Sequence, residues 1–176
     1  VMVKCAGKSV LKGIAVGKIY VYRKQEYILK QTQIDDVKAE QERFELAVSE
    51  AKGQLDILYK NALKTVGEEE AMIFDVHKMM LEDEGYLEDI KEMIAGKCNE
   101  EYAVNEVGNN YSQMFAAMDD DYMKARSADV LDISKRIINN LAGTQDASIK
   151  TKEPVILLAD DLTPSETIQM DKSKIL

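Results

Sequence analysis

The chain has 176 residues, of which 45% are hydrophobic and 31% charged, a balance typical of one globular domain or two small subdomains. Its formal net charge of −9 argues against binding to nucleic acid or to an anionic membrane, because both require cationic side chains, and favours a partner with a basic surface. No apolar run approaches the length of a membrane span. Cys5 and Cys98 lie far apart outside any CxxC, so we expect no disulfide and a reducing cytosol.

Residues 1–30 have the composition of β-strands. The stretch GIAVGKIYVY combines small and β-branched residues with alternating tyrosines, and EYILK predicts a second short strand. Gly13 and Gly17 form a GxxxG spacing that lacks the glycine, lysine and serine of a phosphate-binding loop. We therefore expect these glycines to serve turns or close backbone contacts.

Residues 35–143 are predicted to be helical almost throughout. Asp35 and Asp36 can cap the first helix, whose seam positions recur at alternating steps of four and three. This heptad-like spacing predicts packing against another helix through Val37, Gln41, Phe44, Val48, Ala51, Leu55, Leu58 and Ala62.

Three further helices are expected before residue 144. The second begins after Gly67 with acids that suit a helix N-terminus, and Gly96 closes it. The third and fourth are separated by DDD at 119–121, which is expected to form a turn and the cap of the fourth helix, and the fourth stops at Gly143. Four helices with short connections predict hairpins packed side by side. Their expected apolar faces are Val104, Val107, Tyr111, Met114, Phe115 and Met118 on the third helix, and Leu131, Ile137, Ile138 and Leu141 on the fourth.

Residues 153–176 return to α/β character. The continuous apolar run VILLA predicts a strand buried on both faces. In DLTPSE, Thr163 is the expected N-cap, Pro164 the first helical residue and Glu166 the partner in a capping box. KSKIL is interpreted as the start of another strand, so the α/β unit is expected to continue past residue 176. The pattern predicts an α/β unit interrupted by a helical insert of roughly a hundred residues.

The second helix carries two stripes when its residues are placed at about 100° per residue. The first is typical of a core face and contains Ile73, Val76, His77, Met80 and Leu81. The second consists of methionines rimmed by acids, namely Glu68, Met72, Asp75, Met79 and Asp83. Because methionine suits adaptable contact surfaces and acids select a basic partner, the second stripe predicts a docking surface.

His77, the only histidine, is expected to be a packed core residue rather than a catalytic group or a metal ligand. A di-iron bundle would need a glutamate three positions earlier, where Phe74 stands, and no HExxH occurs. No serine or cysteine lies nearby in sequence to act as a nucleophile, although spatial neighbours stay open. The sequence predicts neither a metal site nor a catalytic residue in this segment.

Four stretches carry a resemblance to a known family: GIAVGK, GEEEAMIFDVHKMMLEDE, DDDYMKARSADVLDISKRI and LLADDLTPSET. In this order, over essentially all 176 residues, the chain resembles the amino-terminal domain of Enzyme I, the phosphoenolpyruvate-protein phosphotransferase of the bacterial sugar phosphotransferase system. The resemblance implies an α+β fold, in which a four-helix insert of helical hairpins interrupts a swivelling phosphohistidine α/β domain. The implied parts are the α/β domain at 1–33, a helical subdomain at 34–144 that binds the phosphocarrier HPr, and the return to the α/β domain at 145–176.

The resemblance also implies an activity, in which a phosphoryl group moves from phosphoenolpyruvate to a histidine of the enzyme and then to a histidine of HPr. The Gly-Gly-x-Thr-Ser-His motif of that histidine and the magnesium-binding phosphoenolpyruvate barrel are absent from these residues, and Lys12 replaces the family's usual proline or glutamate. We therefore expect docking without catalysis or a cofactor in this segment. Magnesium, and dimerisation through a carboxy-terminal domain, belong to the cytoplasmic parent enzyme.

Carried over position by position, the family's partner-binding face falls on Glu68, Glu69, Met72, Asp75, Met79, Met80, Asp83, Tyr86, Phe115, Met118, Tyr122, Met123 and Arg126. For Arg126 an alternative is exposed ion pairing with Asp129 and Asp132 on the same helix. Alternatives for the whole chain are a nitrogen-type Enzyme I or a multiphosphoryl-transfer paralogue, and a helical adaptor with no catalytic parent.

Overall fold

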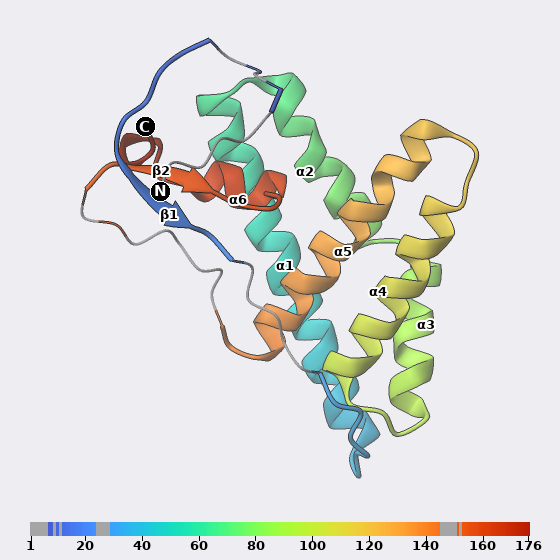
Figure 1. Cartoon of the computed structure of the whole chain (residues 1–176). Coiled ribbons are helices and arrows are strands. Elements are labelled where there is room, and N and C mark those ends of the chain that lie inside the picture. Colours follow the sequence, from blue (N-terminus) through green and yellow to red (C-terminus); the bar gives the residue numbers. More distant parts are fainter. Residues whose placement is uncertain (1–6, 9, 11, 24–28, 145–150, 152) are drawn as a thin grey trace.

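The fold consists of five successive helices inserted between two strands, in a computed structural model that describes residues 7–8, 10, 12–23, 29–144, 151 and 153–176 (Figure 1). This confirms the α+β class and the helical insert expected from the sequence. Along the described residues the elements are β1 (Lys18–Val21), α1 (Val37–Thr65), α2 (Glu68–Met80), α3 (Glu84–Ala95), α4 (Glu100–Ala116), α5 (Asp121–Leu141), β2 (Val155–Leu158), α6 (Pro164–Gln169) and a 3-10 helix (Lys172–Lys174).

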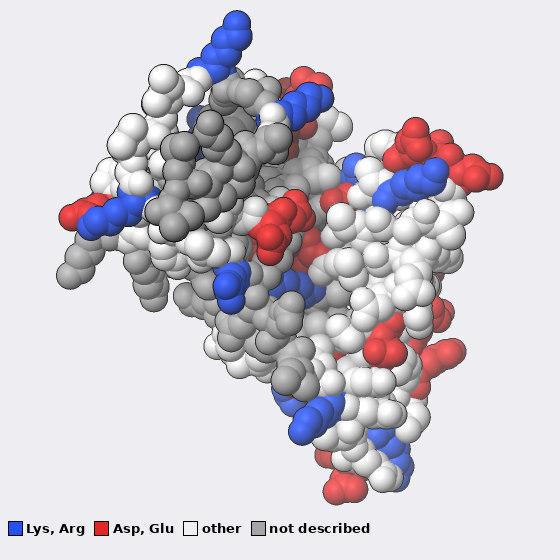
Figure 2. Space-filling view, in the orientation of Figure 1, with Lys and Arg blue, Asp and Glu red and all other residues white. Residues whose placement is uncertain are grey.

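Three helices begin at caps that the sequence predicted. Of the two candidate aspartates, Asp36 caps α1, because its carboxylate accepts a hydrogen bond from the Ala39 amide at 3.0 Å. Asp120 caps α5, and acidic side chains gather at the tip where α4 meets α5 (Figure 2). At α6, Thr163 and Glu166 form the expected reciprocal capping box, with Pro164 in the first turn. These local contacts fix where the helices start.

The predicted single helix from Glu68 to Gly96 is wrong, because the structure divides it into α2 and α3. The Asp83 carboxylate accepts from the Tyr86 amide at 2.8 Å and caps α3. An aspartate that offers its side chain to the backbone competes with continued helix and favours a new helix start. The insert therefore contains five helices among the described residues rather than the four expected.

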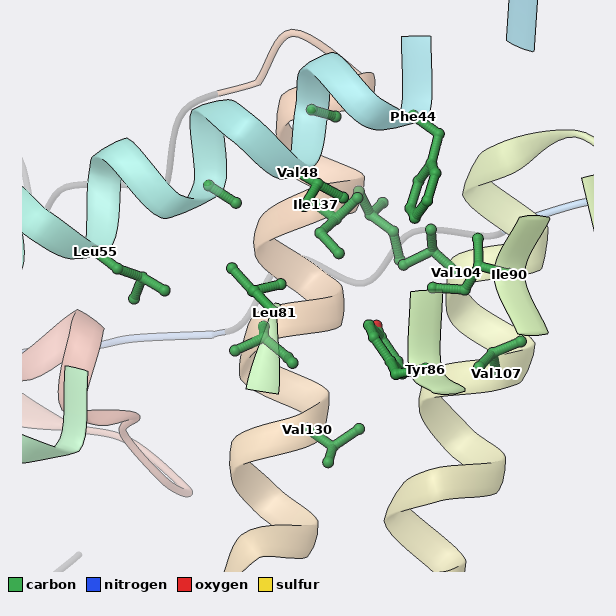
Figure 3. Packing of buried hydrophobic residues seen from close by; sticks show 14 of the residues in the cluster. Phe44, Val48, Leu55, Leu81, Tyr86, Ile90, Val104, Val107, Val130 and Ile137 are labelled. Carbon is green, nitrogen blue, oxygen red and sulfur yellow. The ribbon is translucent and has the colours of Figure 1, made fainter. Parts of the chain in front are cut away.

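The hydrophobic core lies between the five helices α1 to α5 (Figure 3). The seam expected along α1 is confirmed, since its residues from Phe44 to Ala62 at the predicted spacing are buried. From α5, Val130, Ile133 and Ile137 enter the core at steps of three and four. Leu131 was expected on this face but is exposed, because it stands one position beyond Val130 and turns away.

The two strands pair in parallel, with Lys18 opposite Val155 and Val21 opposite Leu158. Within β2 Val155 is buried, Ile156 and Leu157 are half-buried and Leu158 is 55% exposed, so the expectation of a strand buried on both faces is wrong. KSKIL forms a 3-10 helix capped by Asp171 instead of a strand, and only Ile175 makes a bridge to Val155. Most of the strand predicted in EYILK lies outside the described residues, and Leu29 and Lys30 are not in a strand.

Candidate docking surface

The outer face of α2 exposes two methionines between acids. Met72 is 57% exposed and Met79 is 69% exposed, and Glu68, Glu69 and Asp75 are also exposed. Large apolar side chains left in water at helical spacing, rimmed by one sign of charge, are typical of a surface that a partner covers. The exposure predicted for the second stripe is therefore confirmed for its members on α2.

Asp83 does not belong to that stripe. It lies beyond the end of α2, where its carboxylate is occupied as the cap of α3. Its placement on the stripe assumed an unbroken helix, which the structure does not contain. Asp83 remains exposed, so it can still contribute negative charge near the end of α2.

The opposite face of α2 packs on the helical core. Ala71, Phe74 and His77 are buried, and the Lys78 ammonium donates to Asp56 of α1 at 2.8 Å. That ion pair lowers the pKa of the Asp56 carboxyl and raises the pKa of Lys78, each through the hydrogen bond to the other. Met80 is half-buried against the core. The helix therefore turns one face inward and leaves the methionine face outward.

A second part of the predicted set lies where α4 ends and α5 begins. Tyr122 is 63% exposed, and the guanidinium carbon of Arg126 lies 4.7 Å from the centre of its ring. Phe115, Met118 and Met123 are half-buried. The arginine forms a cation–π contact with the tyrosine ring, and both residue types are enriched in protein interfaces.

Tyr86 does not belong to this surface, and its prediction as a partner contact is wrong. It is 2% exposed, shares a hydrogen bond of 2.9 Å with Ser134 and packs edge-on against Tyr111. Burial raises the pKa of the Tyr86 hydroxyl. The new helix start at Asp83 turns this residue inward, so it supports the fold rather than touching a partner.

A buried polar cluster joins the two parts of the surface. The His77 Nε2 lies 3.2 Å from Asp129 Oδ1, and Arg126 Nη1 lies 2.7 Å from Asp129 Oδ2. The His77 Nδ1 lies 3.5 Å from Asp132 Oδ2, which accepts from the Ser165 hydroxyl at 2.9 Å. Polar contacts thus join the last turn of α2, the first half of α5 and the start of α6.

This cluster refines two predictions made from the sequence. His77 is fully buried, as expected for a core residue, but its neighbours are aspartates as well as apolar side chains. The ion pair of Arg126 with Asp129 is mostly buried, not exposed as the alternative assumed, because α2 covers it. The missed signal was the spacing of Asp129 and Asp132, which puts both carboxylates on the inward face of α5.

Neither a metal centre nor a membrane span is found in the described part of the chain. Its residues contain no group of three or more His, Cys, Asp or Glu side chains placed to hold a metal ion. None of its helices is both long and apolar enough to cross a membrane. With Met72 and Met79 exposed and Arg126 fixed by Asp129, the geometry is suited to docking.

Comparison with known families agrees with this architecture. A family model described as "PEP-utilising enzyme, N-terminal" matches residues 6–126, more than half of the chain. The chain belongs to this family. Helices α2, α3 and α4 lie entirely within the matched region, which ends at Arg126 on α5, so the family assignment includes the candidate docking surface.

Three proteins similar in sequence to this chain are each named phosphoenolpyruvate-protein phosphotransferase. One from Bacillus sp. (strain S) is 37% identical, and the match covers 96% of this chain and 30% of the relative. One from Bacillus subtilis is 35% identical, and the match covers 97% of this chain and 30% of the relative. One from Mycoplasma capricolum is 38% identical, and the match covers 94% of this chain and 29% of the relative. The chain spans about 30% of the length of these curated relatives.

Two solved structures share the fold of this family member. An NMR solution structure of Enzyme I (nEIt) matches with a TM-score of 0.75 and 31% identity, over 91% of this chain and 66% of that chain. The N-terminal domain of "Enzyme 1 - Nitrogen" matches with a TM-score of 0.69 and 23% identity, over 93% and 68%. The second likeness concerns the fold alone.

Proposed function

We propose that this chain is the amino-terminal part of a cytoplasmic phosphoenolpyruvate-protein phosphotransferase that serves sugar uptake, and that its α2–α5 surface docks the phosphocarrier HPr. The observation that carries the proposal is the pair of exposed methionines on α2, Met72 and Met79, set among acids. The names of the relatives, each about three times the length of this chain, support the parent activity.

The chemistry of the surface supports a basic, partly apolar partner. Methionine side chains adapt to the contour of the apolar contact, and the acids steer a positively charged surface toward it. Arg126, held by Asp129 and lying over Tyr122, would stand at the edge of the interface and interact there with an anionic group such as a phosphoryl group.

The remaining steps of the proposed reaction belong to the rest of the enzyme. Phosphoenolpyruvate, magnesium and dimerisation are assigned in this proposal to the parts of the relatives that this chain does not match. No magnesium step is assigned to the described residues, which hold no cluster of metal ligands. The role of this segment is to bring the histidine of HPr into reach.

Truncation of Met79 tests the proposal. Met79→Ala is expected to weaken HPr binding by about 2 kcal/mol, roughly thirtyfold in Kd, because it removes a central apolar anchor. The measurement is a calorimetric titration of the protein with HPr. A matched control is Leu46→Ala on α1, since Leu46 is 61% exposed but lies outside the surface. Equal affinities for both variants would refute docking at α2.

Charge removal at the rim should have a different signature. Glu68→Gln is expected to slow association with HPr at low salt and to have little effect at high salt, because salt screens exposed charges. Stopped-flow association rates at two salt concentrations measure this. A loss of affinity that is independent of salt would place Glu68 at the centre of the interface.

Tighter binding of the nitrogen-system phosphocarrier than of HPr would favour the nitrogen-type alternative.

A further inference from the structure

A groove lies on the side of the helical subdomain where α1, the end of α5 and α6 meet. Its volume is about 540 Å³, within the range of small-molecule sites. Figure 1 shows α6 crossing α1, and the two helices are in contact. The lining is rich in amide side chains, among them Gln54, Asn61, Asn140 and Gln169, together with the guanidinium of Arg136.

Arg136 is 5% exposed, and among the described residues its guanidinium makes one hydrogen bond, from Nη1 to Gln54 Oε1 at 3.1 Å. Its Nε has no hydrogen-bond partner among the described residues. A guanidinium has five N–H donors and always carries its charge, and buried charges in proteins are normally paired. Arg136 forms no ion pair with any carboxylate of the described residues.

The carboxylates nearest to Arg136, those of Asp132 and Glu166, line a small pocket with it but have other partners. Asp132 stands one turn before Arg136 on α5, but its carboxylate is engaged by His77 and by the Ser165 hydroxyl. Glu166 lies 3.6 Å from the ammonium of Lys135. Glu50, the carboxylate among the groove residues, is exposed, so water screens its charge. The groove therefore contains a mostly buried guanidinium that no carboxylate of the described residues pairs with directly.

The amides around Arg136 are already ordered. Gln54 accepts from Arg136 and donates from Nε2 to Asn140 Oδ1 at 2.7 Å, and Asn140 donates to the Ala47 carbonyl at 3.0 Å. This chain of hydrogen bonds fixes the guanidinium on α5 against α1 before any ligand arrives. A preorganised guanidinium binds planar or tetrahedral oxyanions through parallel N–H···O bonds.

We propose that this groove is a binding site for a small metabolite that carries a phosphate or carboxylate group. The oxyanion would pair with Arg136, and the amides of Asn61 and Gln169 at the rim would contact the rest of the molecule. The groove is lined by α1, α6 and the end of α5, whereas the candidate docking surface uses α2 and the start of α5. The site is therefore independent of the proposed HPr docking.

Anion titration of the protein, followed by two-dimensional NMR, tests this site. Inorganic phosphate and succinate serve as the probes, and chloride at equal ionic strength is the reference. Saturable shifts of the Gln54 and Asn140 side-chain amides with phosphate or succinate, but not with chloride, are expected. Saturation by only one of the two probes identifies the anionic group. If neither probe gives saturable shifts in the groove, Arg136 only joins α1 to α5 and the proposal is wrong.

Two variants separate binding from folding. Arg136→Gln is expected to weaken probe binding about tenfold, but it also alters a buried contact. Asn61→Asp leaves Arg136 in place and adds a negative charge at the exposed rim, so it should also weaken binding. Asn110→Asp on α4 makes the same change outside the groove and should leave affinity within about twofold. If Asn61→Asp and Asn110→Asp behave alike, with both proteins folded, the site does not lie in this groove.

Discussion

Replacement of Arg43 by methionine is expected to lower the free energy of unfolding by about 3 kcal/mol, because it leaves a buried carboxylate without its partner. Glu100 is completely buried at the start of α4, and its Oε1 lies 2.7 Å from Arg43 Nη1 on α1. Arg43 also donates to Glu101 and to the Leu141 carbonyl, so one side chain joins α1, α4 and the end of α5. The partial positive charge at the α4 N-terminus offsets only part of the loss.

Denaturant unfolding of Arg43→Met measures this effect. The matched control is Lys38→Met, which removes an exposed cation of α1 that lies 3.6 Å from Glu42 and should cost less than about 0.5 kcal/mol. Adding Glu100→Gln to Arg43→Met should recover stability, because a neutral amide is less costly to bury than an unpaired carboxylate. Equal destabilisation by Arg43→Met and Lys38→Met would show that the buried ion pair contributes no more than a surface pair.

Local signals in the sequence predicted most of the helical fold. The seam of α1 and the caps at Asp36, Asp120 and Thr163 depend on residues within one or two turns of one another. Such contacts have fixed spacings, so a single sequence is sufficient to recognise them. The parallel strand at 155–158 was recognised in the same way from its continuous apolar run.

Features that depend on distant residues were not predictable in this way. Tyr86 is buried because its hydroxyl meets Ser134, which lies 48 residues along the chain. The break between α2 and α3 depends on Asp83 preferring the cap position to continued helix, a choice that apolar periodicity does not register. Leu158 stays exposed although VILLA has the composition of a fully buried strand.

The part of the candidate site formed by one helix face was predictable from the sequence, whereas the buried polar cluster around His77 was not. Periodicity alone placed Met72 and Met79 on the exposed side of α2, and the structure confirms that exposure. The aspartates that surround His77 come from α5, more than fifty residues away, and an aspartate in a helix is normally read as a solvent-exposed residue. The same reasoning hides Arg136, whose burial depends on α1 and α6 closing over it.

His77→Ala is expected to lower the free energy of unfolding by about 3 kcal/mol. The change empties a fully buried position beside Phe74 and removes the group between two carboxylates, Asp129 and Asp132. Asp129 keeps Arg126 and Asp132 keeps Ser165, so the cluster loses its centre but not all of its contacts. Thermal unfolding measures the loss of stability.

Affinity for HPr separates this buried role from docking. At a temperature where His77→Ala is fully folded, its Kd should stay within about threefold of the unmodified protein, because the imidazole does not reach the surface. Met79→Ala should show the reverse pattern, with stability changed by less than about 0.5 kcal/mol and a large loss of affinity. Loss of binding by folded His77→Ala, together with normal binding by Met79→Ala, would mean that the partner contacts the face of α2 assigned here to the core.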